Sequence, residues 1–343
     1  MKTWSDSKPK GEPAEPAGAE RVPPGGGGRS RSGRWPPGAG EGGHGKHTTL
    51  EPAVAKVAKG DAGEVVRSQE NPWIKRVRRA GRGQEPGSLV LDGPHLVGEA
   101  LEAGIALPVV LTTPEFARRE EGAALVERIQ EAGRAAGWLE AIRVVDAGLL
   151  TKLAETETPA GVLALARWKL GPAEYPRFWA AVDRAAAGGP PFVVVADGIQ
   201  DPGNLGSLFR TAAAAGAQGM IILPGTVAPT NSKVLRASAG ALFRLPWIKM
   251  EAGELAREVR ARGIRVFLAD ARGEQAWHEP DYRGGTAIVI SNEGRGPSPE
   301  ARALADGVVA IPLAGGVESL NAAAAGAILL FEVVRQRGRA LPK

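Results

Sequence analysis

The sequence lacks cysteine entirely and has only four histidines among its 343 residues. The absence of cysteine excludes disulfide bonds, thiolate catalysis and cysteine-ligated zinc. Four histidines are too few for a histidine-rich metal centre, so we expect an activity that uses no bound metal.

Long apolar runs are also missing, although hydrophobic residues make up 43% of the chain. No run approaches the roughly 18 apolar residues that cross a bilayer. The opening stretch MKTWSDSKPK has no apolar segment behind its charges, and nearby acidic residues argue against a transit peptide. We therefore expect a cytoplasmic protein that does not enter a membrane.

The chain has little excess of charge of one sign, since 43 basic residues face 38 acidic ones and the net charge is +5. This balance suits a polyanionic partner such as RNA, and it suits an ordinary solvated basic surface equally well.

The length predicts two domains with some additional chain. Residues 1–59 are rich in glycine and proline, which predicts a disordered tail; its arginines beside Trp35 offer an alternative RNA contact. We expect a small α/β domain over 60–170, a linker over 171–190 and a second α/β domain over 191–343.

The first domain has apolar segments at 88–91, 109–111, 142–145 and 162–165, which predict strands. Helical patterns lie between them, including one that runs from Pro114 to about Ala136, and this alternation predicts a mainly parallel sheet. A basic cluster at the start of the domain predicts a phosphate-contacting RNA surface and consists of Lys75, Arg76, Arg78 and Arg79.

The second domain has continuous apolar runs typical of parallel strands buried on both faces. They lie at 192–196, 219–223, 264–269, 286–291 and 308–313, with another strand expected between 243 and 248. Helical segments intervene, and a last helix is expected from Ser319 toward Gln336. The pattern predicts an open parallel sheet of five or six strands, whose ligands bind at the carboxyl ends of the strands.

Three loops at those ends have unusual sequences: DPGNLGSLFRTA, SNEGRGPS and IPLAGGVESLNAAAA. The glycines of the first loop fit neither the dinucleotide fingerprint nor a P-loop, which disfavours a nucleotide-dependent oxidoreductase or ligase. In this order, and across residues 191–336, the three loops resemble the motifs of the SpoU/TrmH family in the SPOUT superfamily.

Upstream, SQENPWIKRVRRA, LVLDGPHLVGEALEAG and KLAETETPAGVLALA are similar to the substrate-binding domain of ribosomal RNA members of this family. The family usually has Glu where this chain has Asp92, which keeps the charge. The resemblance implies transfer of a methyl group from S-adenosylmethionine to a ribose 2′-hydroxyl, most consistent with ribosomal RNA. The alternatives are a transfer RNA 2′-O-methyltransferase and a non-catalytic RNA-binding protein.

The resemblance further implies a C-terminal trefoil knot, a homodimer whose active site draws on both protomers, and a set of catalytic residues. Arg210 would be the catalytic arginine, acting either as a base or as an electrostatic stabiliser. A guanidinium keeps its proton to above about pH 12, which favours the second role. The same set includes Asn204, Glu293, Ser319 and Asn321. Ser319 is alternatively the N-cap of the last helix, and Glu293 a capping or solvated carboxylate.

The cofactor residues implied by the resemblance lie in the same loops. Backbone groups would bind S-adenosylmethionine at Leu268, Ala269, Ile290, Gly294, Ile311 and Leu313, with Leu320 packing against the adenine. Gly294, Gly296 and Gly316 would let the backbone approach the ligand closely. Ile311 and Leu313 are also explained as ordinary core residues.

Overall fold

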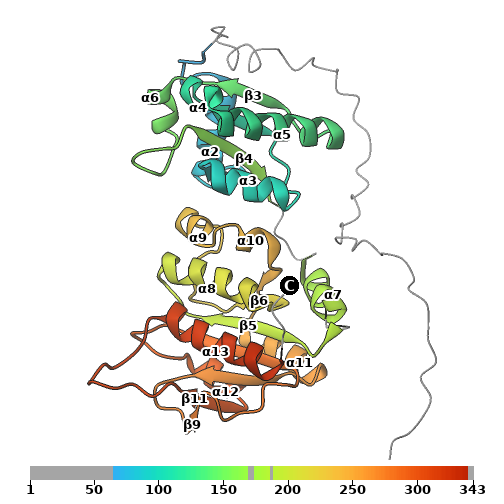
Figure 1. The fold of residues 1–343 in the computed structure, drawn as a ribbon, viewed down its shortest axis with the longest axis vertical. Coiled ribbons are helices and arrows are strands. Elements are labelled where there is room, and N and C mark those ends of the chain that lie inside the picture. The colour runs from blue at the N-terminus through green and yellow to red at the C-terminus, as the bar shows by residue number, and fades with distance from the viewer. Residues whose placement is uncertain (1–64, 169–173, 186–187, 339–343) are drawn as a thin grey trace, which may run out of the picture. The chain divides into compact units, whose positions relative to one another are not determined.

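The structure is a computed structural model, which describes residues 65–168, 174–185 and 188–338 (Figure 1). The predicted tail at 1–59 lies outside the described residues. The first domain, here residues 65–168, is a small α/β domain, and the second, here 174–185 and 188–338, is an α/β domain with a seven-stranded parallel sheet.

The first domain contains a four-stranded sheet in the order β1-β4-β2-β3. Its strands are β1 (Ser88–Asp92), β2 (Val109–Thr112), β3 (Ala141–Val144) and β4 (Val162–Arg167). β2 and β3 are parallel, but β4 runs antiparallel to both β1 and β2, so the prediction of a mainly parallel sheet was wrong for this domain. The link from β3 to β4 contains only the five-residue α6 (Ala147–Thr151). It does not cross back over the sheet, so β4 starts at the end of the sheet where β3 finishes.

Helices cover both faces of this sheet. α2 (Pro72–Gly81) and α6 pack on one face, and α3 (Pro94–Glu102), α4 (Pro114–Arg118) and α5 (Glu120–Ala136) on the other. The single helix predicted from Pro114 is broken at Arg119, whose backbone is extended. A Cβ at Gly122 would lie 1.9 Å from the carbonyl oxygen of Phe116, so α5 meets α4 at a contact that only glycine permits.

The second domain has seven parallel strands rather than five or six, in the order β7-β6-β5-β10-β8-β11-β9. The additional strand, β9, has two residues and no apolar run, which is why the pattern did not reveal it. The bounds are β5 (Phe192–Asp197), β6 (Gly219–Ile222), β7 (Trp247–Lys249), β8 (Arg265–Ala269), β9 (Gln275–Ala276), β10 (Thr286–Ser291) and β11 (Gly307–Ala310).

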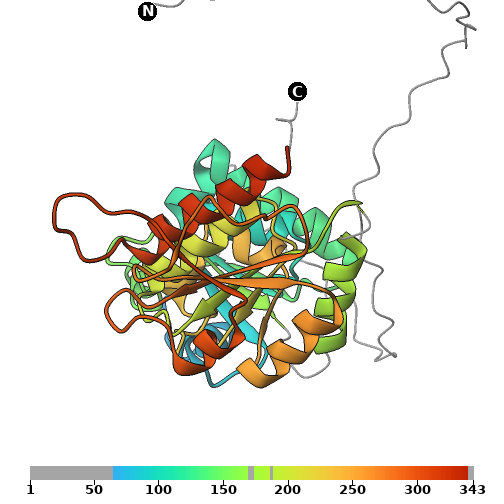
Figure 2. The same ribbon diagram turned by 90° about the horizontal axis from the view of Figure 1, so that it is seen from below.

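Both faces of the second sheet are covered by helices because the strand residues alternate between two cores. Val194 of β5 packs with α8 (Pro202–Ala214) and α13 (Ala322–Gln336), whereas Val195 packs on the opposite face. Figure 2 shows α13 in red and α11 in orange on opposite sides of the sheet. The first face also carries α9 (Ser232–Ala237) and α10 (Ala241–Arg244), and the second carries α7 (Glu174–Ala185), α11 (Ala252–Ala261) and α12 (Pro299–Leu304).

α7 lies within the segment interpreted as a linker, and its side chains are part of the second core. Phe178, Trp179 and Val182 are buried there beside Val193 and Ile221. The described part of this segment therefore contributes to the packing of the second domain. In the described residues, no helix combines the length and apolarity needed to cross a membrane.

Candidate active site

The three loops of unusual sequence leave the carboxyl ends of β5, β10 and β11, at one edge of the same parallel sheet. β5 and β10 are neighbours, and Asp197 lies opposite Ser291 in their register. The first two loops therefore start side by side, and the third leads into α13, which packs against α8 on the same face.

Three of the five predicted catalytic residues form one hydrogen-bonded network. The side-chain amide of Asn204 donates to Oε1 of Glu293. The amide of Asn321 donates to Oδ1 of Asn204 across 2.7 Å, and the backbone N–H of Ala322 donates to Glu293 Oε1 across 2.9 Å. The network joins the three loops through their side chains.

Helix capping explains why these residues meet. Asp201 caps α8 by accepting from the backbone N–H of Asn204, and Asn321 caps α13 by accepting from the N–H groups of Ala323 and Ala324. The first turns of both helices therefore contact Glu293, whose negative charge is favourable at helix N-termini. The cap of the last helix is Asn321 rather than Ser319.

Arg210 and Ser319 are not part of this network. Arg210 lies six residues beyond Asn204 on α8, which places it about 240° around the helix axis. Its side chain is exposed, and within the part of the chain that the structure describes it has no hydrogen-bond or ion-pair partner. Ser319 is exposed too, at the rim of the adjacent cavity.

A cavity of about 280 Å³ lies beside the network, near the lower end of the roughly 300–1,000 Å³ of small-molecule sites. Glu293 and Ser319 are among its lining residues. Leu268 is not, because its side chain is fully buried in the core on the opposite face of the sheet. The other predicted cofactor residues all line the cavity: Ala269, Ile290, Gly294, Ile311, Leu313 and Leu320.

The cavity walls combine apolar side chains with charged groups of both signs. Ile290, Ile311 and Leu320 offer surface against which a flat ring system can be buried. The charged lining consists of three carboxylates and three guanidinium groups: Asp270, Glu293, Glu318, Arg272, Arg295 and Arg302. Two of the three predicted glycines have the left-handed backbone that requires glycine, Gly296 with φ +68° and Gly316 with φ +74°. Gly294 does not have this backbone, and a Cβ there would make only an ordinary contact at 3.6 Å.

Sequence reasoning missed two residues that shape the second loop. Asn292 accepts from the backbone N–H groups of Gly294 and Arg295 through Oδ1, and donates to the carbonyl of Gly198. Asp197 is 2% exposed and accepts two hydrogen bonds from the ends of that loop. The available signal was an aspartate closing an otherwise apolar strand, where a buried carboxylate is costly.

The basic cluster on α2 is largely paired within its own domain. Arg76 is half-buried and bonds to Glu85 at 2.6 Å and to Glu140 at 2.5 Å. Partial burial lowers the pKa of Arg76, but the hydrogen bonds to these carboxylates outweigh it and raise the pKa above its usual value. Lys75 pairs with Glu70 at the surface. Arg78 bonds to Gln69, and Arg79 lies 3.8 Å from Glu85.

Comparison with known proteins gives two family matches. Residues 191–331 match the SpoU rRNA Methylase family, and residues 71–164 match the MRM3-like substrate binding domain.

Individual relatives agree with these matches. An uncharacterized tRNA/rRNA methyltransferase of Synechocystis sp., slr1673, is 32% identical over 277 residues, which cover 79% of this chain and 94% of that protein. The 23S rRNA (guanosine-2′-O-)-methyltransferase RlmB of Ralstonia nicotianae is 39% identical over 150 residues, which cover 43% of this chain and 60% of RlmB.

Two solved structures are similar over most of their length. The rRNA methyltransferase of Sinorhizobium meliloti superimposes with a TM-score of 0.65 at 27% identity, covering 79% of this chain and 97% of that one. The SpoU methyltransferase AviRb of Streptomyces viridochromogenes, in complex with the cofactor AdoMet, gives a TM-score of 0.65 at 27% identity, covering 78% and 98%.

Proposed function

We infer the function of this chain from the fact that it belongs to the SpoU rRNA methylase family. It is an S-adenosylmethionine-dependent RNA methyltransferase that acts on a ribose 2′-hydroxyl, and we propose ribosomal RNA as its substrate. The observation that carries the proposal is the network of Asn204, Glu293 and Asn321 beside the cavity. The match of the first domain to a substrate-binding domain supports an RNA partner.

The lining of the cavity offers groups suited to S-adenosylmethionine. Leu320 would pack against the adenine, and backbone groups are proposed to hydrogen-bond the cofactor at Ala269, Ile290, Gly294, Ile311 and Leu313. Leu268 would take part only through its backbone. When bound, the cofactor supplies a methyl group on a sulfonium, and the acidic side chain of Glu293 suits that positive charge.

The remaining task of the protein is to align the ribose oxygen and to ease loss of its proton. Positioning dominates such a transfer because the donor is already activated. Glu293 is held by two hydrogen bonds, so it presents a fixed acceptor to the substrate. We assign to Arg210 the binding of the adjacent phosphate and stabilisation of the developing alkoxide, since a guanidinium does not give up its proton near neutral pH.

We further propose a homodimer in which Arg210 acts with the network of the other copy. The exposed side chain of Arg210 and its position on α8 away from Asn204 support this arrangement. α13 offers an apolar surface for the second copy, because Phe331 is 49% exposed and Ile328 on the preceding turn is partly exposed.

The trefoil knot is proposed on the same basis. From β11, near one edge of the sheet, the chain forms the long loop 311–321 and returns as α13 to pack on α8 and β10. That path is compatible with threading of the C-terminal segment through a loop. We place the enzyme in the cytoplasm, where it would meet RNA without a membrane or metal partner.

The proposal is tested by transfer of a labelled methyl group from S-adenosylmethionine to unmodified ribosomal RNA and, separately, to transfer RNA. Wild-type protein is expected to label ribosomal RNA, and Arg210→Ala to lower the rate by about 100-fold or more. Arg257→Ala, which removes an exposed arginine of α11, is the matched control and should resemble the wild type.

Label in transfer RNA alone would replace the proposed substrate by the alternative one. No transfer to either RNA, together with no binding of S-adenosylmethionine, would favour a non-catalytic RNA-binding protein.

A further inference from the structure

Asp197 is a buried acid at the carboxyl end of β5 that the proposed mechanism does not use. Its residue surface is 2% exposed, and no lysine or arginine pairs with it among the described residues. A carboxylate in such a place is costly unless hydrogen bonds compensate it. The bonds that do so are therefore informative about what this residue does.

Two hydrogen bonds compensate this carboxylate, one from the last residue of β10 and one from the end of the loop that follows it. Oδ2 of Asp197 accepts from the hydroxyl of Ser291 and from the backbone N–H of Ser298, each across 2.9 Å. Its backbone carbonyl accepts from the N–H of Asn292 across 3.1 Å. The two ends of the segment 292–297 are thus held by one residue of the neighbouring strand.

The segment between those ends forms one wall of the cavity. All of residues 292–297 line it, and Glu293 extends from it to Asn204 and Ala322. Ser298 closes the segment as the N-cap of α12, accepting from the N–H of Ala301. A shift at either end would therefore move the cavity wall and the carboxylate of Glu293 together.

We propose that Asp197 is a positioning residue that acts through Ser291 and Ser298 to fix segment 292–297 in the shape that receives S-adenosylmethionine. This inference rests on the proposed function, since it names the cofactor of that site. Asp197 is not among the residues that line the cavity, so it would act by setting the geometry of residues that do.

The test compares Asp197→Ala, Asp197→Asn and Ser291→Ala with wild-type protein. Asp197→Ala removes both bonds, Asp197→Asn keeps one oxygen able to accept both, and Ser291→Ala removes one bond from the loop side. Asp306→Ala is the matched control, because Asp306 accepts from the N–H of Val266 in the same sheet, away from segment 292–297.

The first readout is amide hydrogen exchange without cofactor. In Asp197→Ala, the amides of Gly294 and Arg295 should exchange faster while those of β5 and β10 keep wild-type protection. The second is calorimetric affinity for S-adenosylmethionine, which should weaken by about tenfold, or about 1.4 kcal/mol. Ser291→Ala should show a smaller loss, and Asp197→Asn should regain most of the affinity.

Wild-type exchange and affinity in Asp197→Ala would overturn the inference, as would an equal loss of affinity in Asp306→Ala. If Asp197→Ala fails to fold, Ser291→Ala decides by the same two readouts. A wild-type protein that does not bind S-adenosylmethionine would refute the proposed function instead, and the exchange measurement would still test whether Asp197 holds the loop.

Discussion

The side chain of Asn321 has two separable roles. Its Oδ1 caps α13, and its Nδ2 donates to Asn204. The first task stabilises a helix and the second fixes the orientation of the Asn204 amide, which in turn donates to Glu293. Substitutions that remove one task and keep the other can therefore tell stability from site geometry.

We predict that Asn321→Ser keeps the cap but lowers kcat, because a serine hydroxyl can cap a helix yet is too short to replace the amide donor. The expected loss in kcat is about tenfold, equivalent to about 1.4 kcal/mol in the barrier. Asn321→Ala should show a similar loss in kcat and, in addition, a free energy of unfolding lower by about 1 kcal/mol. Urea unfolding and initial rates measured on both variants check this, and equal destabilisation by Ser and Ala would contradict it.

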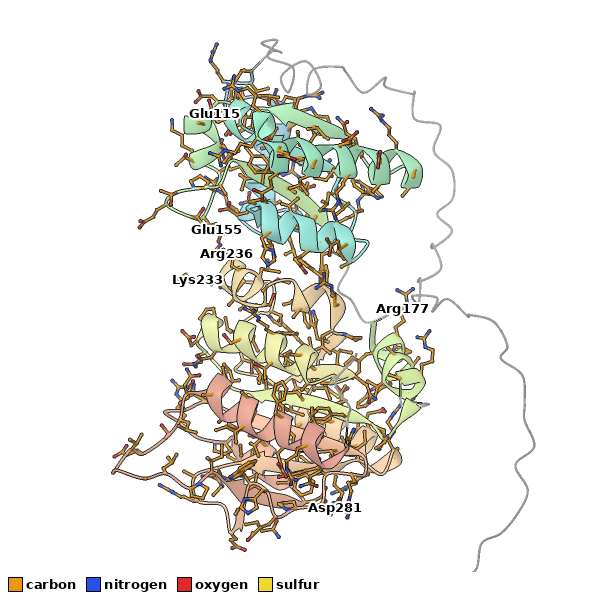
Figure 3. All side chains as sticks on the ribbon, in the orientation of Figure 1. Glu115, Glu155, Arg177, Lys233, Arg236 and Asp281 are labelled. Carbon is orange, nitrogen blue, oxygen red and sulfur yellow. The ribbon has the colours of Figure 1, made fainter. Side chains whose placement is uncertain are left out.

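The ion pair between Arg283 and the exposed residue Asp281, which is labelled in Figure 3, should make stability depend on pH. A hydrogen bond from the Arg283 side chain at 2.9 Å lowers the pKa of Asp281 to about 2. Because folding lowers the pKa of Asp281, its ion pair with Arg283 stabilises the folded protein fully above the unfolded-state pKa of about 3.9. This stabilisation is lost as the pH falls through about 2. Salt should weaken it at this exposed site.

NMR titration of the Asp281 carboxyl measures the effect directly. Wild-type protein should titrate near pH 2, and Arg283→Ala should return the carboxyl toward its ordinary range. An unchanged titration in Arg283→Ala would show that this arginine is not the cause.

The family resemblance of the three loops named the residues of the network but did not predict their hydrogen-bond partners. The asparagines and the glutamate were visible in the three loops, and they meet as direct hydrogen-bond partners. The spacing of six residues between Asn204 and Arg210 on a predicted helix already separates their side chains by about 240°, but it does not predict that Arg210 is exposed. The role of Asp197 depends on which strand lies beside β5, and no local pattern contains that information.

At the scale of elements, α13 is secured at both ends. Its first turn is capped by Asn321 beside Glu293, and its last residues hold the segment before β10. The Arg337 side chain, directly after the helix, donates to the carbonyls of Tyr282 at 3.0 Å and Gly284 at 2.6 Å. It also donates to the carbonyls of Pro190 at 2.8 Å and Pro191 at 3.1 Å, at the entry to β5.

We predict that Arg337→Ala destabilises the protein by about 2 kcal/mol, since hydrogen bonds from a charged donor contribute about 1.5–3 kcal/mol each and water replaces some of them. The measurement is the free energy of unfolding in urea, with Arg257→Ala as the exposed control. A change no larger than that of the control would refute the role of Arg337 as an anchor.

Periodicity located most of the described strands and helices but missed features that depend on close approach. The helix expected from Pro114 is divided at Arg119, and its two parts meet where Gly122 lies against the carbonyl of Phe116, a contact that no apolar spacing encodes. The direction of β4 was also missed, since an apolar run predicts a buried strand without stating which way it runs.

At the scale of the whole molecule, the proposed dimer separates the site between two copies of the chain. Arg210 would come from one copy and the network of Asn204, Glu293 and Asn321 from the other. Neither the knot nor the dimer follows from apolar periodicity, and general topology rules disfavour knots. Both were expected only through the family resemblance of the three loops.

We predict that mixing Arg210→Ala chains with Asn321→Ser chains restores activity. In a mixed dimer one site would combine an intact arginine with an intact network, whereas sites built within one chain would each keep a defect. Co-expression with two affinity tags isolates the mixed dimer for the rate measurement. Activity no greater than the mean of the two variants would place Arg210 and the network in the same chain.

The position of the label in the RNA distinguishes transfer of the methyl group to a ribose oxygen from transfer to a base. RNA labelled by the wild-type protein is hydrolysed in alkali, which cannot cleave the phosphodiester next to a 2′-O-methylated ribose. We expect the label in an alkali-resistant dinucleotide. Label recovered in single nucleotides, as methylated bases, would contradict this expectation.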